Sequence, residues 1–279
     1  MRFHVLTLFP EIPRAFFESS IMAKAVARGI VSYNLVNVRD FAFDRHRKCD
    51  DGTFGGGAGM LMLPEPLSLA IESVGVKPRR PFPEGEGEPG PESPRKRVVY
   101  VTPSGRPFTQ GLAQELARED ELVFISGRYE GIDQRVIDAY VDDEISIGDY
   151  VMSSGELAAT VIVDAVYRLL DGVISSESLE EESFSDGLLE YPQYTRPEIF
   201  RGVAVPEVLL SGHHENIRRW RLRKRVEKTL RVRPELIDKA RASGFLTGET
   251  EKIIKELQNE HGADPENRGG PEEGRGSGL

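Results

Sequence analysis

The feature that most constrains the fold is the alternation of short apolar runs with helical patterns over the first 170 residues. These runs predict strands at 3–9, 31–38, 97–101, 122–126 and 141–147, of which 3–9 is expected to be buried and 31–38 alternates apolar and polar residues. Helical patterns lie between and after them, near 10–29, 64–74, 108–117, 133–139 and 156–170. Alternation of this kind predicts an α/β fold with a mainly parallel sheet covered by helices on both faces.

The pattern changes after this region. An acidic, serine-rich segment has little to bury and is expected to be a flexible linker, and the patterns that follow it are all helical. Two segments rich in Pro, Gly and Glu are expected to be disordered. The expected divisions are an α/β domain at 1–174, the linker at 175–190, a small all-helical domain at 191–262, a disordered tail at 263–279 and a disordered insertion at 77–96.

Several classes of protein do not fit the sequence. The most apolar long stretch, 157–170, contains Asp164 and Arg168 and cannot span a bilayer. The N-terminal apolar run ends at Pro10 without a cleavage site, so we expect a strand rather than a signal peptide. The single cysteine, Cys49, excludes an internal disulfide framework and a cysteine-cluster zinc site. We therefore expect a cytoplasmic protein with no membrane partner.

Charge is unevenly distributed along the chain. The net charge of −10 argues at first against a nucleic-acid partner, but residues 218–233 hold nine Lys or Arg and one Glu. Binding depends on the local field rather than on the total charge. This helix therefore favours phosphate binding, and a solvated helix face is the alternative reading.

The glycine patterns do not indicate a nucleotide-binding motif. The G-x-G-x-x-G at 85–90 has no strand before it, and the G-x-G-x-G at 55–59 follows a charged segment. No G-x-x-x-x-G-K-[ST] is present. The loop at 50–60, with five cations just before it, is compatible with two readings: a nucleic-acid contact or a mobile surface loop.

Three glycine-containing segments, 100–105, 127–133 and 147–156, each follow a predicted strand. The carboxyl ends of parallel strands meet at one sheet edge, where open α/β sheets bind ligands. Turn formation alone would explain any one segment, but three together predict a pocket.

At these segments the chain closely resembles the bacterial tRNA (guanine-N1)-methyltransferases of the SPOUT class. The resemblance covers about residues 1–260 apart from the insertion. The matching motifs are Leu8-Phe9-Pro10-Glu11, Arg39-Asp40-Phe41, Asp44-Arg45-His46-Arg47, Gly55-Gly56-Gly57-Ala58-Gly59-Met60-Leu61-Met62, Gly127-Arg128-Tyr129-Glu130-Gly131-Ile132-Asp133, Ser146-Ile147-Gly148-Asp149-Tyr150-Val151, Tyr194-Thr195-Arg196-Pro197-Glu198, Leu210-Ser211-Gly212 and Ile217-Arg218-Arg219-Trp220-Arg221.

The resemblance implies a trefoil-knotted sheet, a helical tRNA-binding domain and an obligate homodimer whose subunits share each active site. It implies that S-adenosylmethionine, the methyl donor, binds bent in the knot. The implied cofactor-binding residues are Tyr100, Val101, Thr102, Pro103, Gly127, Tyr129, Glu130, Gly131, Ile147, Gly148, Asp149, Tyr150, Val151, Met152 and Gly155. Ser154 and Ala158 replace a glycine and a proline that are usual in the family's cofactor loop.

The implied target is the guanine immediately 3′ of the anticodon of tRNA, with no DNA partner. Guanine N1 must lose a proton before it can attack, so a carboxylate base and a cation that stabilises O6 are needed. The family positions correspond to Glu182, a longer carboxylate than the usual aspartate, and Arg168; Asp186 is a weaker candidate for the base. Magnesium dependence is implied too, but no metal-ligand cluster fixes a site. The residues expected to contact tRNA are Arg39, Arg45, Gly57, Gly59, Arg218, Arg219, Arg221 and Arg223.

Three rival functions remain to be weighed. A SPOUT enzyme that methylates another RNA atom, such as a ribose 2′-hydroxyl, would not need a base for N1. An RNA-binding regulator without catalysis would bind tRNA but not S-adenosylmethionine. An α/β enzyme with a small-molecule substrate would leave the basic helix without a role.

Overall fold

The computed structural model describes residues 1–79, 96–175 and 182–262. The chain divides into two compact units, Met1–Ser175 and Ser176–Leu279, and each is described by itself. The expected disorder of the tail, and of the insertion except at its two ends, concerns residues outside the described ranges. None of the helices that the structure describes is long and apolar enough to cross a membrane.

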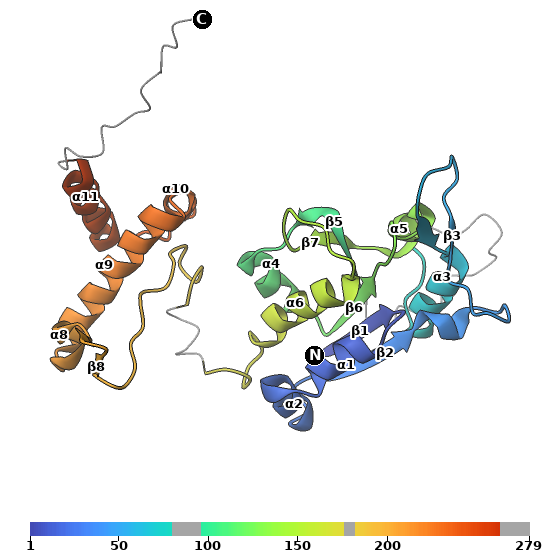
Figure 1. Ribbon diagram of the computed structural model, residues 1–279, viewed down its shortest axis with the longest axis horizontal. Helices are drawn as coiled ribbons and strands as arrows, with labels where there is room; N and C mark the ends of the chain where they lie inside the picture. Colours follow the sequence, from blue (N-terminus) through green and yellow to red (C-terminus); the bar gives the residue numbers. More distant parts are fainter. Residues whose placement is uncertain (80–95, 176–181, 263–279) are drawn as a thin grey trace, which may run out of the picture. The chain divides into compact units, whose positions relative to one another are not determined.

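The first unit is built on a five-stranded sheet (Figure 1). Its strands are β1 (Arg2–Thr7), β2 (Ser32–Asn37), β5 (Arg97–Pro107), β6 (Glu121–Ser126) and β7 (Asp143–Ser146). Their order is β2-β1-β6-β5-β7, and every neighbouring pair is parallel. The prediction of a mainly parallel sheet is confirmed.

Helices cover both faces of this sheet (Figure 1), as predicted. Side chains alternate between the faces: in β6, Leu122 and Phe124 belong to one core cluster, and Val123 and Ile125 to the other. The first cluster is completed by α1 (Glu11–Phe17), α2 (Ser20–Ala27), α4 (Gln110–Leu116) and α6 (Gly155–Tyr167). The second is completed by α3 (Pro64–Ser73) and α5 (Gln134–Tyr140).

Two elements differ from the sequence-based prediction. The single helix expected at 10–29 is divided into α1 and α2, because the Ser19 hydroxyl donates to the Ala15 carbonyl and Ser20 takes a φ of 51°. The strand expected at 97–101 continues to Pro107, with a register shift against β7 between Val101 and Arg106.

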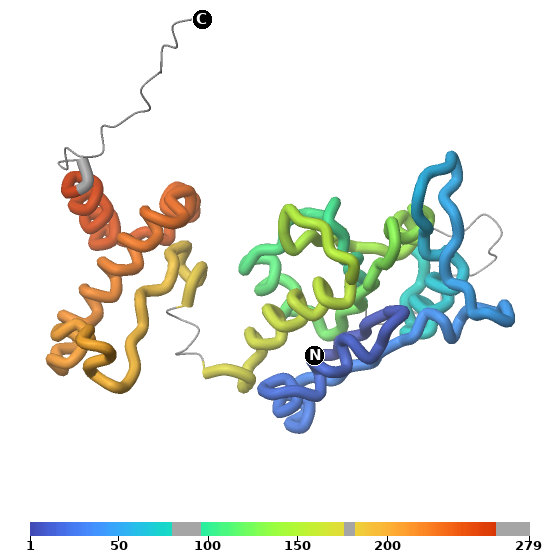
Figure 2. The backbone as a smooth tube through the Cα atoms, viewed as in Figure 1, coloured from blue at the N-terminus to red at the C-terminus, as the bar shows by residue number. Residues whose placement is uncertain are grey.

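The segment between β2 and α3 extends away from the sheet and returns to it (Figure 2). It starts with the 3-10 helix η1 (Val38–Phe41) and includes the antiparallel pair β3 (Asp50–Gly52) and β4 (Met60–Met62). The glycine-rich loop, residues 53–59, connects these two strands. The backbone of β4 bonds the loop after β6, since Glu130 N donates to Met60 O at 3.0 Å and Met62 N to Gly131 O at 3.0 Å. One end of the glycine-rich loop is therefore fixed beside the end of β6.

The second unit contains α8 (Glu207–Leu210), α9 (His214–Val232), α10 (Glu235–Ala242) and α11 (Gly248–Gly262). It also contains a hairpin of β8 (Ile199–Phe200) and β9 (Val203–Ala204), so the prediction of an all-helical domain is wrong at this point. These strands are too short and exposed to produce an apolar alternation in the sequence.

The prediction of a flexible linker up to residue 190 is also wrong in its described half. Leu188, 1% exposed, packs in a core cluster with Val226, Ile237, Ile254 and Leu257. The Leu189 backbone N–H donates to the Thr229 hydroxyl at 3.0 Å. Because the segment is mostly acidic and serine-rich, its composition did not indicate that its short apolar part packs against the core of the second unit.

Candidate active site

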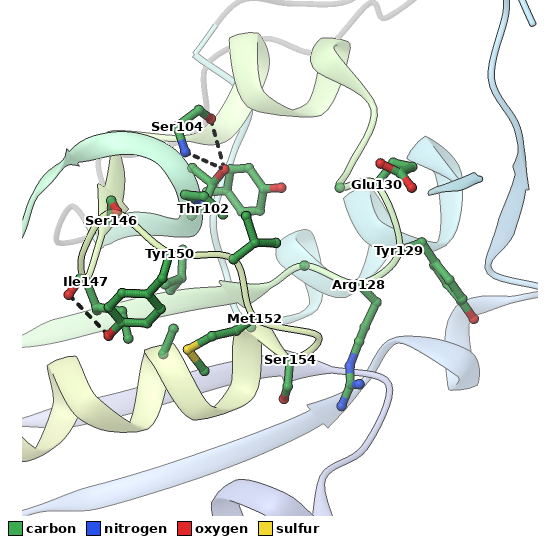
Figure 3. Close-up of a pocket in the computed structure, with 18 of the residues that line it drawn as sticks. Thr102, Ser104, Arg128, Tyr129, Glu130, Ser146, Ile147, Tyr150, Met152 and Ser154 are labelled. Carbon is green, nitrogen blue, oxygen red and sulfur yellow. Dashed lines mark hydrogen bonds between the residues drawn. The ribbon is translucent and has the colours of Figure 1, made fainter. Parts of the chain in front are cut away.

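A cavity of about 320 Å³ lies at the carboxyl ends of β5, β6 and β7 (Figure 3). Its walls are formed by residues 100–104 within the long strand β5 and by the segments at the carboxyl ends of β6 and β7, and the carboxyl edge is where parallel sheets bind ligands. Its volume lies at the lower end of the usual range for small-molecule sites. All the expected cofactor-binding residues except Asp149 line it.

Five lining residues were not among those expected: Ser104, Arg128, Ser146, Ser154 and Ala158. All five lie in the three segments singled out in the sequence or within two residues of them. Their position next to those segments is the signal that could have identified them. Figure 3 shows Thr102, Tyr150 and Met152 grouped around the hollow, whereas the side chain of Tyr129 extends away. Tyr129 is 51% exposed.

Two glycines allow the cavity walls to touch through their backbones. Gly155 N donates to Gly127 O at 3.2 Å, and a Cβ at Gly155 would lie 2.7 Å from the Gly127 nitrogen and oxygen. A Cβ at Gly127 would lie 2.9 Å from the Tyr100 ring. The contact between the 127–131 and 147–155 loops therefore requires glycine at 155, and the close packing of the Tyr100 ring against residue 127 favours glycine there.

The buried carboxylate of Glu156 contacts three parts of the chain: the end of β1, the 127–131 loop and the 147–155 loop. Its side chain is 0% exposed. It accepts the Thr7 hydroxyl at 2.6 Å and the Ser154 hydroxyl at 2.9 Å, and it lies 2.9 Å from Arg128 Nε. The Arg128 guanidinium also lies over the Phe9 ring at 4.4 Å and donates to Ser153 O at 3.1 Å. Glu156 thus ties the end of β1 to both cavity loops.

The lining is suited to a ligand with apolar and polar parts. Val101, Ile147 and Met152 offer apolar surface, and the Thr102 and Ser146 hydroxyls add polar groups. Burial raises the pKa of the Tyr100 phenol, which therefore stays protonated at neutral pH. An adenine ring with a ribose and an amino acid has this mixture of surfaces.

The family model described as tRNA (Guanine-1)-methyltransferase TrmD matches residues 1–239, which include all of the cavity. The chain belongs to this family. It is similar to the tRNA (guanine-N(1)-)-methyltransferase of Treponema denticola, at 68% identity over 93% of this chain and 100% of the relative. It is 57% identical to the Treponema pallidum protein of the same name, over 96% of this chain and all of the relative. The Borreliella burgdorferi protein of that name is 56% identical over 85% of this chain and 92% of its own length.

Of the residues expected to catalyse the family's reaction, Arg168 belongs to the first unit and does not line the cavity. Arg168 follows the last residue of α6, while the first residue of that helix, Gly155, lines the cavity. Thirteen residues at 1.5 Å each separate the two ends of the helix by about 20 Å. Glu182 and Asp186 belong to the second unit.

Asp186 has a specific partner in its own unit. Its carboxylate forms a bidentate ion pair with Arg225 of α9, with Arg225 Nη1 donating to Oδ2 at 2.8 Å. Arg225 is buried and also donates to Leu189 O. This arrangement holds the 186–189 segment against α9.

The residues expected to contact tRNA fall into three groups. Gly57 and Gly59 belong to the glycine-rich loop, and a Cβ at Gly59 would lie 2.4 Å from Glu130 Cγ, so this end of the loop touches the cavity segment. Arg39 lies in η1, and Arg45 lies in an exposed turn organised by Asp44, which accepts the backbone N–H groups of His46 and Lys48. The third group, Arg218, Arg219, Arg221 and Arg223, lies on α9.

Proposed function

We propose that this chain transfers a methyl group from S-adenosylmethionine to N1 of the guanine immediately 3′ of the anticodon, tRNA position 37. The observation that carries the proposal is the cavity made by residues 100–104 of β5 and the segments after β6 and β7, within a chain matched by the family model over residues 1–239. The curated relatives are named for the guanine N1 atom, which favours this target over a ribose hydroxyl.

When bound, S-adenosylmethionine supplies a methyl group on a positively charged sulfur. The cavity residues hold the donor and keep water from the methyl group. Glu182 takes the proton from guanine N1, and Arg168 stabilises the negative charge that then develops on O6. Guanine N1, now carrying a lone pair, accepts the methyl group.

The ion pair of Asp186 supports Glu182 as the base. Asp186 is held by the buried Arg225, and moving it to a substrate would leave that guanidinium without its carboxylate. Asp186 is better suited to fixing the segment that follows Glu182.

The position of Arg168 supports a site shared between two copies. Because it lies about 15 Å along α6 from Ala158, the last residue of that helix in the cavity wall, it serves a cavity only if that cavity belongs to another subunit. Leu157 and Val161, one turn apart on α6, are 50% and 48% exposed and offer an apolar face to a second copy. The homodimer is part of the proposal.

A trefoil knot formed around the strand-end loops is a further part of the proposal, supported by the close backbone approach of Gly155 to Gly127. The second unit is proposed to hold tRNA, and the reaction is proposed to take place in the cytosol. Magnesium dependence stays an expectation: among residues 1–79, 96–175 and 182–262, no group of three His, Cys, Asp or Glu side chains is arranged to hold a metal ion.

The decisive experiment is methyl transfer to tRNA transcripts that carry G or A immediately 3′ of the anticodon, with mass analysis of the digested product. We expect 1-methylguanosine from the G transcript and no product from the A transcript. A ribose-methylated product, or tRNA binding without donor binding in calorimetry, would favour the rival functions.

The assignment of the base is tested by single-turnover methylation at saturating tRNA. We expect Glu182→Gln to slow the chemical step at least about 100-fold, which is the usual contribution of a general base. Asp186→Asn, the matched control, should retain much more of that rate, and a near-normal rate for Glu182→Gln would contradict the assignment.

A further inference from the structure

The basic helix α9 carries its cations on two faces that differ in their surroundings. Arg218, Arg219 and Arg223 face carboxylates, three of which come from α11. Arg218 lies 2.9 Å from Glu249, and Arg219 lies 3.7 Å from the same group. Arg223 lies 2.7 Å from Glu260 and 3.6 Å from Glu256.

This acid-covered face has no excess of positive charge. Its three arginines meet four carboxylates: Glu215 on α9, and Glu249, Glu256 and Glu260 on α11. The hydrogen bond from Arg218 holds the pKa of Glu249 below its usual range, so this acid is ionised at neutral pH. A phosphate approaching here would meet a field close to zero and would have to displace a carboxylate from each arginine.

The other face is different. Arg221, Lys224, Lys228 and Arg231 recur at intervals of three and four residues, which places them along one side of α9. Lys224 is paired with Glu227 at 2.8 Å. Within the described residues, Lys228 and Arg231 have no carboxylate within ion-pair distance. The Arg221 guanidinium lies 4.7 Å from the centroid of the Tyr191 ring.

We infer that the side of α9 formed by Arg221, Lys224, Lys228 and Arg231, called here the 221–231 stripe, binds the phosphates of the tRNA. The inference deepens the proposed function and rests on it for the identity of the RNA. Lys228 and Arg231, which have no carboxylate within ion-pair distance among the described residues, lie in line with Arg221 and Lys224, and successive cations are about 4.5–6 Å apart along the helix axis. Such a row of cations complements a sugar–phosphate backbone.

The test is the salt dependence of tRNA binding by the full chain, measured by fluorescence anisotropy over a range of potassium chloride concentrations. Each lost phosphate contact lowers the slope of log Kd against log salt by roughly one unit. The double variant Lys228→Gln/Arg231→Gln should lose roughly two units of slope and bind tRNA more weakly. The single variant Lys228→Gln should lose roughly one unit.

The matched control is Arg219→Gln/Arg223→Gln, which removes two cations from the other face of the same helix. Its slope should stay within half a unit of the unmodified chain. An equal or larger loss of slope in the control, or no loss in the stripe variants, would overturn the inference. Fluorescence of Trp220, on the same helix, checks that the second unit is folded in every variant.

The two proposals fail in different ways. Methyl transfer by the unmodified chain to guanine N1, together with equal slopes in both double variants, would leave the proposed function standing and remove the stripe. A stripe-dependent slope without any methyl transfer would remove the proposed function and keep the RNA-binding face.

Discussion

Replacing Glu156 by alanine tests whether one buried carboxylate holds the cavity together. The substitution removes the acceptor of the Thr7 and Ser154 hydroxyls and the partner of Arg128. Glu156 lies in the first turn of α6, where a carboxylate also interacts favourably with the helix dipole. Four interactions therefore end with one side chain.

The expected loss of folding free energy depends on the contacts that Arg128 keeps in the variant. Removing one partner of a buried ion pair costs about 3–5 kcal/mol. The Arg128 side chain is 18% exposed and keeps its contacts with Ser153 O and the Phe9 ring, so we expect the lower end, about 3 kcal/mol. Glu156→Gln keeps one oxygen as an acceptor for a hydroxyl and should cost about 1–2 kcal/mol. The control Glu115→Ala breaks an ion pair with Arg97 at a half-exposed carboxylate and should cost less than about 1 kcal/mol.

The measurement is urea unfolding followed by far-ultraviolet circular dichroism. The single tryptophan, Trp220, lies in the second unit, so its fluorescence follows that unit separately. We expect the dichroism transition of Glu156→Ala to move to lower urea by more than the Trp220 transition does. A loss in Glu156→Ala no larger than that in Glu115→Ala would refute the role assigned to this carboxylate.

Three further outcomes are expected. Gly155→Ala should weaken S-adenosylmethionine binding at least about 10-fold in calorimetry, because its Cβ would lie 2.7 Å from Gly127 backbone atoms. The control Gly111→Ala, whose Cβ would have its nearest neighbour at 3.9 Å, should leave the affinity unchanged. Equal affinities in the two variants would contradict the steric argument. Burial is the main cause that lowers the pKa of His4 from 6.5, so the folded state favours the neutral ring and its stability should fall as the pH drops below about 6.5. His4→Asn should remove that part of the pH dependence of thermal unfolding. An unchanged pH profile in this variant would contradict the role of His4. Mixed dimers of Arg168→Ala and Gly155→Ala chains should recover methyl transfer that neither variant shows alone, because one of the two shared sites is then intact, and no recovery would place Arg168 in its own chain's site.

The sequence predicted the elements whose side chains fill the core. The strands β1 and β6 and the first half of β5 are mainly apolar and buried on both faces, and this pattern is visible without a structure. The missed strands β3, β4, β8 and β9 have two or three residues each, too few for any periodicity. The division between α1 and α2 depends on the Ser19 hydroxyl bonding its own helix, which the apolar spacing does not reveal.

The sequence also predicted most of the residues that line the candidate site, but not the buried group that joins its loops. The rule that parallel strands end at a common edge brought the three glycine segments together, and the structure places them around one cavity. Glu156 was not singled out, because an acid in the first turn of a helix usually faces solvent. Its burial depends on Thr7 and Arg128, which are distant in sequence and meet it only in the folded unit.

The charge of α9 shows why a count of cations is not sufficient to locate a binding face. Nine Lys or Arg in residues 218–233 predict phosphate binding, but they surround the helix. Arg225 is buried against Asp186, and Arg218, Arg219 and Arg223 meet the acids of α11, which begins more than twenty residues later. Carboxylates so close in space cancel the field of the arginines they pair with. The field that an RNA meets is therefore set by the cations that packing leaves without a carboxylate. Among the residues that the structure describes on this helix, these include Lys228 and Arg231 of the 221–231 stripe.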